Sequence, residues 1–99
     1  MENPQQLITL YESLAPDDSS EAQSQIRKEF YSQLMGASDE LLGDFAGALG
    51  SKHGIRQERI LERLIWIKGF IQKIEDAIPK IAEAAADAIC ERLETMWSA

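Results

Sequence analysis

Residues 60–85 read ILERLIWIKGFIQKIEDAIPKIAEAA, and their large apolar residues recur at alternating intervals of four and three positions. With two alanines further on, the series is Ile60, Leu64, Ile67, Ile71, Ile74, Ile78, Ile81, Ala85 and Ala88. A heptad pattern of this length is typical of a coiled-coil seam, where the apolar stripe of one helix meets that of another. The pattern therefore predicts one long helix over about residues 55–97.

Pro79 is the main interruption of this predicted helix. A proline inside a helix removes one backbone hydrogen bond and usually kinks the helix. We expect a kinked but continuous helix, because the segment EDAIPK (residues 75–80) contains no glycine, serine or asparagine that would favour a turn. The alternative is a break at Pro79, which would produce a helical hairpin with its tip near EDAIPK.

The first half of the chain predicts three shorter helices. Asn3 followed by Pro4 is a typical helix start, because asparagine caps the first turn and proline lacks an N–H that would be unpaired there. Ser20 and Gln23 have the spacing of a capping box, and Ser38 can cap a helix whose first turn is acidic. The predicted helices cover about residues 4–14, 21–35 and 39–49.

The composition supports an all-α single domain over residues 1–99. The chain has no valine, two threonines and three prolines, and it lacks the Asn-Gly and Asp-Gly pairs that mark β-hairpins. Apolar residues make up 44% and charged residues 27%, which is the balance of an ordinary soluble protein. We therefore predict three short N-terminal helices packed on a long, proline-kinked C-terminal helix.

The length of the predicted helix favours a homodimer. A helix over residues 55–97 would be about 63 Å long, whereas a compact domain of this size is roughly 30 Å across. Three short helices cannot cover such a rod, and the remaining isoleucines would be exposed to water. We expect a second copy to cover them, in parallel or antiparallel orientation, along a dimer seam of Ile60, Leu64, Ile67, Ile71, Ile74, Ile78 and Ile81.

The charge and the N-terminal segment argue against membranes and nucleic acid as partners. The formal net charge is −7, so phosphate backbones and anionic lipids repel the chain. The start MENPQQ has no basic or apolar run of a signal peptide, and no stretch approaches the roughly 20 apolar residues of a membrane span. A single cysteine fits a reducing compartment, which predicts a cytoplasmic location.

The sequence contains no pattern of catalytic, cofactor-binding or metal-binding residues. His53 is the only histidine, and no second metal ligand is spaced to join it. Cys90 lies on the outer face by the heptad count and has no histidine near it to act as a base. We therefore expect no enzyme activity, no cofactor and no small-molecule substrate.

The function predicted from these features is protein–protein interaction, as a small chaperone, adaptor, inhibitor or immunity-type factor. The partner would be an unidentified protein, in addition to the second copy. Trp66 lies beside the small Gly69 and off the seam, and the third helix carries glycines that make it easy to displace. The expected partner contacts are Trp66, Phe70, Leu42, Phe45, Glu83 and Asp87.

Two alternative functions remain open at the sequence level. The segment FAGALGSKHGIRQERIL (residues 45–61) loosely resembles a helix-turn-helix, and a DNA-binding regulator would use the bases Lys52, Arg56, Arg59 and Arg63. Its apolar positions after the turn are out of phase by one residue, and the overall charge opposes DNA binding. The other alternative is an acidic mimic of nucleic acid that inhibits a basic protein, with binding that falls steeply as salt is added.

Overall fold

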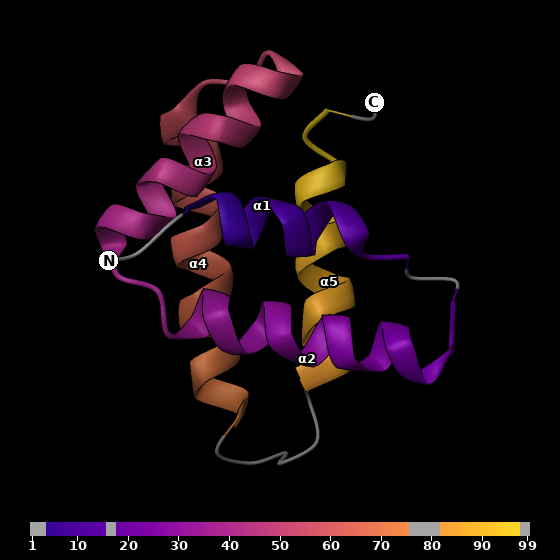
Figure 1. Cartoon of the computed structure of the whole chain (residues 1–99). Coiled ribbons are helices and arrows are strands. Elements are labelled where there is room, and N and C mark those ends of the chain that lie inside the picture. Colours follow the sequence, from indigo (N-terminus) through magenta and orange to yellow (C-terminus); the bar gives the residue numbers. More distant parts are fainter. Residues whose placement is uncertain (1–3, 16–17, 76–81, 98–99) are drawn as a thin grey trace.

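The computed structural model describes residues 4–15, 18–75 and 82–97, with only the backbone described at 74, 75 and 82. The described residues form helices and no strands, which confirms the all-α prediction. In Figure 1, α1 and α2 cross α4 and α5, while α3 lies along one side against α4. The helices are α1 (Pro4–Ser13), α2 (Glu21–Met35), α3 (Asp39–His53), α4 (Gln57–Glu75) and α5 (Ala82–Glu94).

The starts of α2 and α3 follow from their serine caps. The Ser20 hydroxyl accepts a hydrogen bond from the Gln23 N–H at 3.3 Å, and the Ser38 hydroxyl accepts one from the Leu41 N–H at 3.2 Å. Each cap satisfies a backbone donor that has no partner inside the helix. The predicted cap of α1, Asn3, lies outside the described residues.

The Gln23 side chain differs from the predicted capping box. Its amide connects α2 to the end of α1: Nε2 donates to the Ser13 carbonyl, and Oε1 accepts from the Ala15 N–H, both at 2.9 Å. The Ser20 N–H donates instead to the Asp18 carboxylate at 2.8 Å. Gln23 therefore connects the start of α2 to the end of α1. The sequence pattern does not predict this contact, because it depends on where the end of α1 lies in the folded chain.

The predicted long C-terminal helix is wrong. The structure has two helices in its place, and α4 and α5 lie side by side instead of end to end (Figure 1). The described residues span 32 × 32 × 27 Å, which cannot contain a rod of about 63 Å. Folding the chain back lets α5 cover apolar surface that a rod would leave in water. Pro79, where the kink was predicted, lies outside the described residues.

The apolar stripe of α4 is buried inside this single chain. Ile60, Leu64, Ile67 and Ile71 are exposed by 0%, 1%, 5% and 4%, so they belong to the chain's own core. The remaining predicted seam residues, the Ile74 side chain, Ile78 and Ile81, lie outside the described part. The largest fully buried side chains are Phe30, Phe45, Leu7, Leu34, Leu42, Leu49, Ile60, Leu64, Ile89 and Leu93.

The inward face of α5 follows the heptad count only in part, since Ala85 of the heptad series is buried. Ala88, a predicted seam residue, is exposed, whereas Cys90, expected on the outer face, is buried beside Ile89 and Leu93. Once α5 packs as a separate helix, it no longer has to continue the register of α4. Ile89 and Leu93 lie one turn apart and supply most of the apolar volume that α5 contributes to the core.

Arg27 connects three segments from within the structure. This buried residue of α2 forms an ion pair with Asp87 of α5, with Nε 2.9 Å from Oδ1. Its Nη2 donates to the carbonyls of Ala15 at 3.1 Å and Asp18 at 2.7 Å. A buried guanidinium requires such partners, because desolvation without them would be very costly. The pair holds α5 against α2.

The residues after α5 pack against the body of the protein. The indole of Trp97 stacks on the His53 imidazole, with ring centroids 4.0 Å apart and planes 4° from parallel. The same indole meets the Tyr11 ring edge-on at 6.3 Å. Aromatic contacts of this kind anchor the end of the chain against α1 and α3.

Candidate functional site

A groove runs along the junction of α4 and α5, and we call it the α4–α5 groove. It consists of three adjoining recesses of ≈ 450, ≈ 270 and ≈ 390 Å³. The first and second recesses share Trp66, and the first and third share Arg63. The groove is lined by Arg59, Glu62, Arg63, Trp66, Ile67, Phe70, Ile71, Ala84, Ala85, Ala88, Glu91, Arg92, Thr95 and Met96.

Two aromatic side chains form the most exposed apolar part of the groove. Trp66 and Phe70 are one helical turn apart on α4 and are 55% and 52% exposed. Their rings stack, with centroids 5.6 Å apart and planes within 10° of parallel. Stacking fixes both rings in position, so little side-chain entropy would be lost when another molecule covers them. Exposed aromatic residues of this kind often mark binding surfaces.

The opposite wall of the groove is made of small residues. Ala84, Ala85 and Ala88 of α5 face the aromatic pair, while Ile67 and Ile71 form the floor. A methyl side chain fills little of the space between two helices, so a hollow remains where larger residues would have met. This hollow can accept apolar side chains from another molecule.

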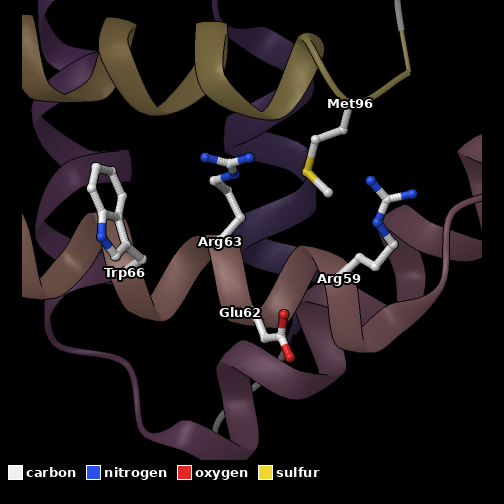
Figure 2. Close-up of a pocket in the computed structure, with 5 residues that line it drawn as sticks. All are labelled: Arg59, Glu62, Arg63, Trp66 and Met96. Atoms are coloured by element: carbon white, nitrogen blue, oxygen red, sulfur yellow. The ribbon is translucent and has the colours of Figure 1, made fainter.

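Arginines surround the groove. Arg59, Arg63 and Arg92 line it and form no ion pair with any described residue, whereas Arg27 and Arg56 are both paired with carboxylates. Figure 2 shows Arg59 and Arg63 extending from α4 with the Met96 side chain between them, while Glu62 points away. The guanidinium groups that lack an acidic partner among described residues are therefore gathered at one place on an acidic protein.

The α4 side of the groove has a simple sequence signature that we did not recognise. Arg59, Arg63, Trp66 and Phe70 each precede one residue of the apolar stripe, so they repeat the same four-three-four spacing. On a helix, such a shift by one position creates a second stripe beside the first. No comparable sequence pattern predicts that Arg92 and the alanines of α5 line the groove, because their position there depends on α5 packing beside α4.

The other predicted contact residues do not line the α4–α5 groove. Leu42 and Phe45 lie in the core, so a partner can reach them only if α3 is displaced. Glu83 and Asp87 lie on α5 outside the groove lining, and Asp87 is already paired with Arg27. One of the two predicted acidic contacts, Asp87, therefore has a structural role.

The four predicted nucleic-acid contacts also divide into two groups. Lys52 forms an ion pair with Glu12 of α1, and Arg56 lies 3.7 Å from Glu58. Arg59 and Arg63 instead line the α4–α5 groove, next to Trp66. The four basic residues thus have different surroundings, and Lys52 and Arg56 already have acidic neighbours.

The described residues contain no set of three or more His, Cys, Asp or Glu side chains that could hold a metal ion. The imidazole of His53 is occupied by its stack on Trp97. The Cys90 thiol is buried and lies 3.5 Å from the Glu94 carboxylate, to which it donates. In the part of the chain that the structure describes, no helix combines the length and hydropathy needed to cross a membrane.

We expect the protein to lose stability at alkaline pH through Cys90 and Tyr11. Burial, reinforced by Glu94, raises the pKa of the Cys90 thiol to about 12, and burial also raises the pKa of the Tyr11 phenol. In the unfolded chain these groups ionise near pH 8.5 and 10. Their contribution to the free energy of unfolding is therefore complete below about pH 8.5. It is lost as the pH rises from there toward the pKa values of the folded state.

Urea titrations at pH 7 and pH 10 would measure this loss, which we expect to be about 1 to 2 kcal/mol in the free energy of unfolding. In the matched control, Cys90→Ala, the decrease should begin nearer pH 10, because only Tyr11 then contributes. Equal stability of the unmodified chain at the two pH values would contradict the prediction.

No protein-family model matches the chain, and it matches neither a curated protein nor a solved structure.

Proposed function

We propose that this protein is a non-enzymatic protein–protein interaction module that binds its partner at the α4–α5 groove. Roles of this kind include small chaperones, adaptors, inhibitors and immunity-type factors. The observation that carries the proposal is the stacked pair Trp66 and Phe70, half exposed beside an apolar hollow. We place its action in the cytoplasm, since its single cysteine requires no oxidising compartment.

The energetics of the groove suit a protein partner. Covering the exposed halves of two large aromatic side chains removes apolar area from water, and each such residue typically contributes about 2 kcal/mol or more at the centre of an interface. Tryptophan and arginine are the residue types most enriched at such centres, and both line the first recess. The surrounding charges would form the polar rim of the interface.

The test is a selection of peptides from a random library on the unmodified protein, followed by affinity measurements on variants. Selected peptides should bind the double variant Trp66→Ala, Phe70→Ala at least about 30-fold more weakly, which corresponds to about 2 kcal/mol. Both side chains are half exposed, so the variant should keep its helical circular dichroism spectrum. The matched control is Ile65→Ala, which removes an exposed apolar side chain of α4 that does not line the groove.

Two results would count against the proposal. One is a selection that yields no peptide above background. The other is a set of peptides whose affinity survives the loss of both aromatic rings or falls equally with Ile65→Ala. Either result would mean that the groove is not the binding surface.

The predicted homodimer is a separate proposal, and its interface needs a different location. The described half of the seam is buried within the chain, so a second copy could use it only if the core opened. Light scattering over a range of concentrations would decide the question, since a dimer has twice the chain mass of 11.1 kDa.

A further inference from the structure

Resting on the proposed function, we infer that the partner segment in the α4–α5 groove is an amphipathic helix of another protein, with acidic residues beside its apolar stripe. The inference specifies the shape of the partner, its apolar spacing and the sign of its charge. Each of these follows from a different property of the groove.

The shape of the groove favours a helix. On α4 the lining extends from Arg59 to Phe70 and Ile71, a distance of about 17 Å along the helix axis, or about three turns. Both walls are helices, and the described residues contain no strand whose edge could pair with an extended peptide. A helix laid into a groove between two helices is a common mode of peptide recognition.

The apolar floor determines which face of the partner enters the groove. Ile67, Ile71 and Ala85 are nearly covered already, and the space above them is bounded by the exposed rings of Trp66 and Phe70. A partner must supply large apolar side chains to fill this space. On a helix of about three turns, residues spaced by three and four positions provide one continuous stripe.

The arginines determine the charge of the partner. Arg59, Arg63 and Arg92 have no ion-pair partner among the described residues, although the chain has seventeen acidic and ten basic residues. Guanidinium groups pair well with carboxylates, often through two hydrogen bonds. Asp or Glu residues beside the apolar stripe of the partner would meet them, while Glu91 on the lining would disfavour further acidic contacts nearby.

Two other occupants fit the groove less well. A second copy placed by two-fold symmetry would bring the same arginine-rich surface against itself, and like charges near the axis repel. A single-stranded nucleic acid could stack on Trp66 and Phe70, but it would leave the aliphatic floor uncovered.

The experiment uses the full chain and three designed helical peptides of about 18 residues, which at about 27 Å extend roughly one turn beyond each end of the groove. All three carry leucines with alternating four and three spacing, and the positions beside this stripe are Glu, Gln or Lys. Binding is measured by fluorescence anisotropy of the labelled peptides, and an oligothymidylate serves as the nucleic-acid probe. The protein variants are Arg59→Gln with Arg63→Gln, and Trp66→Ala.

We expect the Glu peptide to bind at least about tenfold more tightly than the Gln peptide, and the Lys peptide to bind most weakly. The double arginine variant should remove most of the advantage of the Glu peptide and change the affinity of the Gln peptide by less than about threefold. Trp66→Ala should weaken both peptides. Added salt should reduce the preference for Glu.

Other results would overturn the inference. If the Glu peptide fails to bind, or binds no better than the Gln or Lys peptide, the charge assignment is wrong, although library peptides that depend on Trp66 would still support the proposed function. If oligothymidylate alone binds through Trp66, both the inference and the proposed function are wrong. If light scattering shows a dimer that Trp66→Ala dissociates, a second copy occupies the groove.

Discussion

Ile71→Asp is expected to unfold the protein. Ile71 is 4% exposed and lies in the core, so the substitution removes a large apolar side chain and places a carboxylate among apolar core residues. Losing the apolar burial and desolvating the new polar group together cost about 4 kcal/mol or more. A domain of this size has a total stability of roughly 5 to 10 kcal/mol. The variant should therefore keep at most a small part of the native stability and lose its helical structure on mild heating.

Phe70→Asp is the matched control for this prediction. It places the same charge one position earlier on α4, where the native side chain is half exposed, so the variant should remain folded. Circular dichroism and light scattering distinguish the outcomes. A folded Ile71→Asp protein with half the mass of the native one would restore Ile71 to a dimer seam and would contradict the packing described above.

Gly50→Ala is expected to destabilise the protein by about 3 kcal/mol. A Cβ atom at Gly50 would overlap the backbone carbonyl oxygen of Ile55, which follows the turn between α3 and α4. The backbone cannot move away easily, because the Ile55 N–H donates to the Gly50 carbonyl at 3.0 Å. The turn itself requires a left-handed residue at Gly54, with φ of 70°, which further limits adjustment.

Gly43→Ala in the same helix should have the opposite effect. Its Cβ would have only an ordinary contact, 3.8 Å from Nε2 of Gln57, so the better helix propensity of alanine should stabilise the protein by up to about 1 kcal/mol. Urea denaturation of both variants measures the difference. If the two substitutions have similar effects, the close approach between α3 and the α3–α4 turn is not the reason that position 50 requires a glycine.

The helix positions of the N-terminal half could be derived from the sequence because their signals are local. The serines at positions 20 and 38 cap α2 and α3 through backbone donors three residues away. Gly36 follows the last residue of α2, as a stop signal would. The third helix runs to His53 instead of about residue 49, since glycines weaken a helix but tertiary packing of Leu49 and its neighbours outweighs that effect.

The apolar periodicity correctly predicts that one face of α4 is buried. It also predicts that a second chain covers this face, whereas in the structure the same chain covers it. Periodicity shows which face of a helix avoids water, and it contains no information about which surface covers that face. The heptad spacing continued past Pro79, and continuous spacing resembles one helix even when the chain reverses. Ile89 and Leu93 of α5 were overlooked because they fall outside that register.

Two residues of the candidate site could also be derived from the sequence. Trp66 and Phe70 were expected to contact a partner because they lie off the apolar stripe, and the structure leaves both exposed. Leu42 and Phe45 were chosen from the glycine-rich character of α3, and both are buried. An aromatic residue off the main stripe is a more specific indication of an exposed surface than the weakness of a helix.

The sequence by itself determined that this protein is helical, where four of its helices begin, and that one face of α4 must avoid water. Capping and periodicity act over one or two turns, so neighbouring residues suffice to define them. Only the tertiary structure decided that α5 returns beside α4. That reversal brings Arg92 and the alanines of α5 opposite Trp66 and Phe70 and leaves the hollow between them. A contact between residues more than ten positions apart depends on the energy of the whole packed chain, which no local pattern contains.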